Sequence, residues 1–172
     1  MGGELHLALV ELQKLGKLEF LISQNVDNLH LKSGIDPELL LELHGNIAKV
    51  RCSRCEKTFG YSLNRKSCTC AGALFPSVVN FGQSLPEKDL FLSFEHSRRC
   101  DLFVVIGSSL VVTPAVNMPV EALRAGAKLV IVNAGATPLD RDAHLRFHEK
   151  IGEVLPPVVE KLRTSMQMIR IS

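Results

Sequence analysis

Four of the five cysteines in this 172-residue sequence fall within nineteen residues, close enough to share one metal ion. Two residues separate Cys52 from Cys55, twelve separate that pair from Cys68, and one separates Cys68 from Cys70. Four thiolates fill every position around a tetrahedral zinc and leave none for a substrate, so this spacing predicts a structural site. The alternatives are redox-active or merely buried cysteines. Cys100 stands apart, and we predict that it is a small buried residue.

The segment that holds these four cysteines differs in composition from the rest of the chain. Arginine and lysine are interleaved with the cysteines and apolar residues are scarce, so the segment cannot build a core of its own. Metal binding would supply its folding energy, and the basic residues would offset the negative charge of a tetrathiolate zinc. We predict a separate zinc module over residues 50–73, inserted in a domain formed by residues 1–49 and 74–172.

Polar residues follow three apolar segments that are predicted to be strands. They are residues 24–27, residues 107–109 and Asn133. In an open parallel sheet, ligands bind beyond the carboxyl ends of the strands. Gly107 would let the backbone approach a phosphate, with Ser108 and Ser109 as hydrogen-bond donors. The pattern favours a nucleotide site, but no Gly-x-Gly-x-x-Gly motif is present, which disfavours an ordinary dehydrogenase.

His44 lies between the first of these polar loops and the cysteine segment. An imidazole titrates near neutrality, which suits a general base, although a lone histidine is more often structural. The spacing alone leaves both interpretations open.

The elements that would position these residues alternate between strand and helix. Apolar spacing predicts strands at residues 18–22, 78–81, 102–106 and 128–132, the last two buried on both faces. It predicts helices at residues 4–15, 36–43, 115–124 and 152–166, and one opened by residues 84–87 with Leu90, Phe91 and Phe94 turned inward. This alternation predicts an α/β fold with an open parallel sheet.

Composition limits the classes of protein to which the chain can belong. A chain of 172 residues with 46% hydrophobic and 22% charged residues is predicted to form a globular domain. Its longest apolar run, residues 102–106, is far shorter than the roughly 18 residues that span a membrane. A formal net charge of +2 gives no indication of a nucleic-acid or membrane partner. No signal peptide is apparent, so we expect a cytosolic or nuclear protein that is not secreted.

Six ordered motifs resemble those of the sirtuins, which are NAD-dependent protein-lysine deacylases. The resemblance extends from about residue 7 to residue 160 and is closest to the branch with the chromatin-associated mammalian members, prokaryotic members being similar too. The motifs are residues 23–30, residues 43–46, the cysteine pairs, residues 78–82, residues 106–110 and residues 131–133. The resemblance therefore implies a Rossmann-like domain with an inserted zinc module, with NAD+ and one structural Zn2+ as cofactors.

The resemblance also implies a role for each matching residue. His44 would take a proton from the NAD ribose after nicotinamide leaves, and Asn25 and Asp27 would complete the catalytic set and line the nicotinamide and ribose pocket. Further cofactor contacts would come from Gln24, Gly107, Ser108, Ser109, Asn133, Gly135 and Ile151. An acyl-lysine protein or peptide is the implied partner, pairing as an added strand with Val79, Asn80, Phe81 and Gly82. Association with chromatin is compatible with the family resemblance, although nothing else in the sequence indicates it.

One part of the family pattern is missing from this sequence. The first strand of the family, its Gly-rich phosphate loop and an Asp-Phe-Arg cofactor loop have no counterpart here. In the strand order 3-2-1-4-5-6 the missing strand is the central one. Three explanations fit this difference from the family: the sequence is a fragment, its start is mis-assigned, or the protein is a natural short form. Three functions therefore remain open: a deacylase, a mono-ADP-ribosyltransferase with the same NAD cleavage, and a non-catalytic zinc-containing interaction domain.

Overall fold

The computed structural model describes residues 2–62, 66–80 and 82–171. It divides into two compact units, one formed by residues 1–19 and 92–172 and the other by residues 20–91. The boundary falls within helix α3 (Glu87–Arg99). Among the described residues, no helix combines the length and apolar character needed to cross a bilayer.

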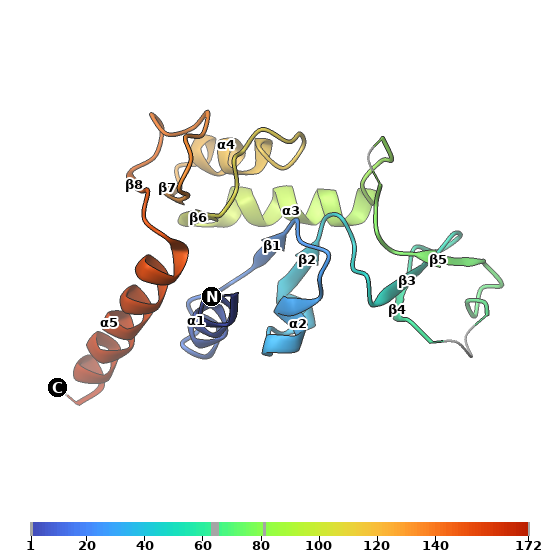
Figure 1. The fold of residues 1–172 in the computed structure, drawn as a ribbon, viewed down its shortest axis with the longest axis horizontal. Coiled ribbons are helices and arrows are strands. Elements are labelled where there is room, and N and C mark those ends of the chain that lie inside the picture. The colour runs from blue at the N-terminus through green and yellow to red at the C-terminus, as the bar shows by residue number, and fades with distance from the viewer. Residues whose placement is uncertain (1, 63–65, 81, 172) are drawn as a thin grey trace. The chain divides into compact units, whose positions relative to one another are not determined.

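A three-stranded parallel sheet forms the centre of the first unit. The strands β6 (Leu102–Ile106), β7 (Lys128–Val132) and β8 (Leu145–Phe147) pair in that order, with Ile106 opposite Val132 (Figure 1). Helix α4 (Asn117–Arg124) connects β6 to β7 and packs against both. The core beneath the sheet is formed by Val105, Leu110, Leu129 and Ile131. The carboxyl ends of three neighbouring strands therefore lie along one edge of this sheet.

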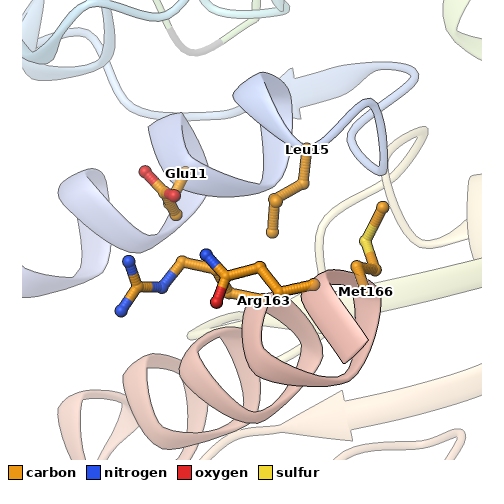
Figure 2. A pocket seen from close by; sticks show the side chains of 5 residues that line it. Glu11, Leu15, Arg163 and Met166 are labelled. Atoms are coloured by element: carbon orange, nitrogen blue, oxygen red, sulfur yellow. The ribbon is translucent and has the colours of Figure 1, made fainter. Parts of the chain in front are cut away.

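Helices α1 (Gly2–Lys14) and α5 (Ile151–Ile171) pack against each other in the same unit. A pocket lies between them, where Glu11 of α1 and Leu15 just after that helix face Arg163 and Met166 of α5 (Figure 2). None of the site residues predicted from the sequence lines this pocket.

The second unit contains two small sheets. Strands β1 (Leu21–Ser23) and β2 (Leu40–Glu42) are parallel, with Ser23 opposite Glu42. Helix α2 (Leu29–Ser33) and a short 3-10 helix (Pro37–Leu39) connect them. Strands β3 (Lys49–Cys52), β4 (Thr58–Gly60) and β5 (Leu74–Pro76) form an antiparallel sheet in the order β4-β3-β5 (Figure 1).

The α/β class with parallel strands is confirmed, and β6 and β7 have the predicted bounds. The β1–β2 and β6–β7–β8 sheets are hydrogen-bonded separately among the described residues. The β1–β2 pair belongs to the second unit and the β6–β7–β8 sheet to the first.

Several predicted elements are wrong in detail. The helix expected over residues 36–43 is a single 3-10 turn capped by Asp36, after which the chain extends as β2 because those leucines pair with β1. The strand expected over residues 18–22 begins only at Leu21. Residues 78–80 form no strand, since they have no partner strand in the described chain, and Phe81 lies outside the described residues.

Two burial predictions are also wrong. Phe91 on α3 is 62% exposed, because the buried face of that helix carries the small residues Ser93 and Ser97. Strand β6 is not buried on both faces: Leu102 and Val104, whose side chains point to the same face of the sheet, are exposed.

Candidate functional site

The imidazole of His44 lies at the carboxyl end of the β1–β2 sheet. Its Nδ1 atom is 3.1 Å from the backbone carbonyl oxygen of Gln24, the residue that follows β1. A carbonyl oxygen only accepts hydrogen bonds, so the neutral ring must carry its proton on Nδ1. Nε2 is then the unprotonated nitrogen. The half-buried ring is therefore fixed in the tautomer that accepts a proton at Nε2.

A buried asparagine holds the loop between β1 and α2 beside this histidine. Asn46 is fully buried, and its amide group donates to Asn28 Oδ1 at 2.7 Å and to Glu42 Oε1 at 2.5 Å. Glu42 also forms an ion pair with Lys49 at 2.7 Å. The neighbouring Ile47 N–H donates to the Val26 carbonyl group. These bonds fix the loop of residues 24–28, where Gln24, Asn25 and Asp27 were predicted to contact a dinucleotide.

Asn25 and Asp27 occupy different positions in that loop. Asn25 is exposed, and its N–H donates to Ser23 Oγ at 3.1 Å. Asp27 is half-buried, and its Oδ1 accepts the N–H of Leu29 at 3.0 Å, at the start of α2. One oxygen of the Asp27 carboxylate therefore stabilises the turn in which Asp27 lies. Its second oxygen is the atom left for a ligand hydroxyl or amide.

The segment after β5 runs directly against the His44 loop. A side chain at Gly45 would come within 1.9 Å of the Ser77 carbonyl oxygen, and Gly45 has a φ of +76°. Ser77 Oγ bonds both backbone groups of Asn46, and the Val79 N–H donates to the His44 carbonyl oxygen at 2.9 Å. The predicted peptide-binding residue Val79 is therefore joined to the predicted base.

Asn80 and Gly82, two of the other predicted peptide contacts, lie near a local pair of hydrogen bonds. The Asn80 N–H donates to the Gln83 side chain at 2.8 Å, and Gln83 N–H donates back to the Asn80 carbonyl group. Gly82 is exposed with a φ of +83°. A peptide strand that pairs with Asn80 must therefore displace the side chain of Gln83.

The four clustered cysteines converge at one end of the β3–β4–β5 sheet. Their sulfur atoms all lie within 4.8 Å of one another, with Cys52 and Cys70 3.4 Å apart and Cys55 and Cys68 3.6 Å apart. A tetrahedral Zn–S4 site with bonds of about 2.3 Å has sulfur separations of about 3.8 Å. Gly72 leaves space for this cluster, since a side chain there would come within 2.4 Å of Cys52 Sγ. The geometry fits a structural zinc.

The ionisation of these thiols also favours a cation. The backbone N–H of Cys70 lowers the pKa of Cys68 to about 6. The backbone N–H of Gly72 lowers the pKa of Cys70, but the other three sulfur atoms outweigh it and raise that pKa to about 11. Four thiolates so close together repel one another, so all four ionise only around a metal ion.

The remaining predicted cofactor residues gather at the carboxyl edge of the β6–β7–β8 sheet. The Gly107 N–H donates to the Val132 carbonyl group, and the Asn133 N–H donates to Phe147, so both positions are fixed by the sheet. Gly107 has a φ of +62°, and a side chain there would touch Ile151 at 3.0 Å. Gly107 and Ile151 are thus side by side, with Asn133 on the adjoining strand end.

The loop residues at this edge differ in exposure. Ser109 and Gly135 are exposed, whereas the half-buried Ser108 accepts the N–H of Leu110 with its Oγ. Asn133 Nδ2 donates to the Gly135 carbonyl oxygen at 2.9 Å. The backbone amides and hydroxyls of this edge are of the kinds that bind phosphate and ribose oxygens.

Comparison with known proteins identifies the family. A model of the Sir2 family matches residues 2–114. The chain belongs to the Sir2 family. NAD-dependent protein deacylase 2 of Archaeoglobus fulgidus is 40% identical over 168 residues, which cover 92% of this chain and 66% of the relative. This Sir2-family chain therefore spans slightly less than two thirds of that relative.

Solved structures give the same assignment. A complex of a Sir2 homologue with NAD has a TM-score of 0.80 at 34% identity, covering 94% of this chain and 65% of the other. A complex of Sir2 with a p53 peptide and NAD+ has a TM-score of 0.76 at 36% identity, covering 92% and 69%. The sirtuin resemblance of the sequence is confirmed.

The sequence motifs did not reveal the residues that hold this Sir2-family site in place. Asn46 belongs to the matched motif after His44, but nothing in its spacing shows that it is the centre of a buried hydrogen-bond network. Arg146, in a strand that the sequence analysis did not predict, contacts the Asn133 loop through backbone carbonyl groups. Such contacts leave no pattern in residue types.

Proposed function

We propose that this chain carries the catalytic part of an NAD-dependent protein-lysine deacylase. The reaction transfers the acyl group of an acyl-lysine to ADP-ribose, consumes one water, and releases lysine and nicotinamide. The observation that carries the proposal is the His44–Gln24 hydrogen bond, which leaves Nε2 of His44 as the proton acceptor. The names of the relatives support the same activity.

NAD+ supplies both the acyl acceptor and the leaving group when it is bound. His44 would accept a proton from a ribose hydroxyl at Nε2. Gln24, Asn25 and Asp27 would contact the cofactor from the loop of residues 24–28. Gly107, Ser108, Ser109, Asn133, Gly135 and Ile151 would bind the phosphates and the adenosine half. No side chain of this set has to act as a covalent nucleophile, so the chain contributes orientation and proton transfer.

An acyl-lysine peptide would bind at residues 79–82, including Phe81. The Val79–His44 hydrogen bond supports this location because it joins the backbone of Val79 to that of the base. Pairing through the main chain would give little selectivity for the peptide sequence, whereas the acyl-lysine side chain would enter the site.

We assign the zinc a structural role in a module over residues 50–73. Cys52, Cys55, Cys68 and Cys70 would hold one Zn2+, and all four positions would then be thiolates. Clustered metal-binding thiols need a reducing compartment, which supports the cytoplasm of a prokaryotic host or the nucleus of a eukaryotic one. The charge of the chain gives no support for a nucleic-acid partner.

One experiment separates the three candidate functions. The chain is incubated with NAD+ and an acetyl-lysine peptide, and the products are analysed by mass spectrometry. Formation of O-acetyl-ADP-ribose with deacetylated peptide supports the deacylase. ADP-ribose attached to an acceptor protein supports transferase activity instead, and peptide binding without any NAD+ consumption supports an interaction domain.

A further inference from the structure

All three guanidinium nitrogens of Arg146 on β8 donate hydrogen bonds, two of them to the loop between β7 and β8 and one to β8 itself. Its Nε donates to Asp140 Oδ1 at 2.7 Å, its Nη2 donates to the Gly135 carbonyl oxygen at 2.5 Å, and its Nη1 donates to the Phe147 carbonyl oxygen. The side chain is only 13% exposed. A planar fork with three fixed partners holds its position far better than a flexible ammonium group would.

The two carbonyl groups that Arg146 contacts are also the two that hold Asn133. Phe147 accepts the backbone N–H of Asn133 at 3.0 Å, and Gly135 accepts its side-chain amide at 2.9 Å. Arg146 therefore bridges both hydrogen-bond acceptors of Asn133. Because Nδ2 is directed at Gly135, the amide oxygen of Asn133 points the opposite way and is available to accept a hydrogen bond.

Asp140 and Thr137 complete this arrangement from the same loop. Thr137 Oγ1 donates to Asp140 Oδ1 at 2.6 Å, and the Thr137 N–H donates to Oδ2 at 3.1 Å. These bonds, together with Arg146, keep the Asp140 carboxylate ionised, so the ion pair with Arg146 is retained across the physiological pH range.

We infer that Arg146 is a positioning residue for dinucleotide binding, which holds the Asn133 amide oxygen toward the ribose hydroxyls of the adenosine half. This inference rests on the proposed function, in which Asn133 contacts that half of NAD+. Arg146 itself acts through its hydrogen bonds to the carbonyl groups of Gly135 and Phe147. Asp140 and Thr137 set the orientation of its fork.

The test is a double-mutant cycle on the binding of ADP-ribose, measured by calorimetry with the 172-residue chain. Arg146→Lys retains the charge but not the fork, and we expect it to weaken binding about tenfold, the loss for roughly one unmade hydrogen bond. Asn133→Ala should weaken binding similarly. In the Asn133→Ala background, Arg146→Lys should have almost no further effect, because the group that it positions is gone.

Arg163→Lys provides the matched control, because Arg163 forms an exposed ion pair with Glu160 in the same unit. It should bind ADP-ribose like the wild type. Thermal unfolding and amide exchange at Asn133 identify any variant that has lost the fold rather than the loop geometry.

The outcomes separate this inference from the proposed function. Additive losses from Arg146→Lys and Asn133→Ala, or wild-type affinity in Arg146→Lys, overturn the positioning role while the nucleotide site stands. If the wild type binds neither ADP-ribose nor NAD+, the proposed function fails and the inference fails with it. Wild-type binding that Asn133→Ala leaves unchanged removes Asn133 from the site and overturns the inference too.

Discussion

His44 and Gln24 are joined by a hydrogen bond of 3.1 Å between the imidazole Nδ1 and a backbone carbonyl oxygen. This bond connects the ends of two parallel strands, since Gln24 follows β1 and His44 lies just beyond β2. Its consequence is chemical, because it assigns the ring proton to Nδ1 and leaves Nε2 as the base. A fixed tautomer is ready to accept a proton without reorganising.

We expect His44→Ala to reduce NAD-dependent deacylation by a factor of about 10² to 10⁴. The side chain is only half-buried, so the melting temperature and zinc content should stay near those of the wild type. Turnover is measured as nicotinamide release. The exposed His148 provides the control, and His148→Ala should keep full activity. Undiminished turnover in His44→Ala would remove this imidazole from the mechanism.

The zinc prediction concerns Cys55, the exposed member of the cluster. We expect Cys55→Ser to lower bound zinc well below one ion per chain, because a tetrahedral site loses a thiolate. The β3–β4–β5 sheet should then become sensitive to trypsin, since the module has little core to replace the metal. Metal analysis and limited proteolysis measure the two effects.

The matched control is Cys100→Ser, because Cys100 lies outside the cluster and its S–H donates to the Ser97 carbonyl group. This variant should retain zinc. Unchanged protease resistance after chelation of the wild-type protein would contradict a structural metal.

Gly45 provides a prediction about stability. A methyl group there would lie 1.9 Å from the Ser77 carbonyl oxygen, and the φ of +76° is strained for any other residue. We expect Gly45→Ala to reduce the free energy of unfolding by about 2–4 kcal/mol. Urea denaturation measures the loss. Gly60→Ala is the control, since a methyl group there would meet no atom within 4 Å beyond its chain neighbours. An equal loss in both variants would mean that the contact with Ser77 is unimportant.

The sequence was sufficient for features that depend on residue type alone. The apolar runs of β6 and β7 predicted strands with the correct bounds, and the cysteine spacing predicted a cluster that the structure brings within 4.8 Å. Residues 40–42 were wrongly predicted to be helical, because three consecutive apolar or acidic residues fit either element until β1 provides a pairing partner. Tertiary pairing, which local spacing does not contain, decides such cases.

The site residues also divide into those that residue type predicts and those that depend on tertiary contacts. The resemblance to the sirtuin motifs indicated His44, but its tautomer depends on a backbone carbonyl group twenty residues earlier in the chain. Arg146 was missed for a similar reason, because two of its three partners are main-chain oxygens and carry no residue identity. Motifs therefore predict which side chains carry out chemistry more readily than which ones hold them in place.

Asp140 gives the prediction on pH. Its pKa is lowered from 3.8 to about 2, first by the hydrogen bond from the Thr137 hydroxyl and also by Arg146. A carboxyl group whose pKa is lower in the folded state stabilises the fold above its unfolded pKa, and this contribution disappears as the pH falls through the folded value. The contribution of Asp140 should therefore be complete above about pH 5 and lost between about pH 4 and pH 2.

Thr137→Val tests the cause, because it removes the hydroxyl that contributes most while keeping the shape of the side chain. We expect NMR titration of the Asp140 carboxyl group to give a higher pKa in this variant, and the loss of stability in acid to begin at a higher pH. Arg146→Lys should raise the pKa less, because a cation remains near the carboxylate. A titration curve that Thr137→Val leaves unchanged would show that this hydroxyl does not hold Asp140 in its ionised form.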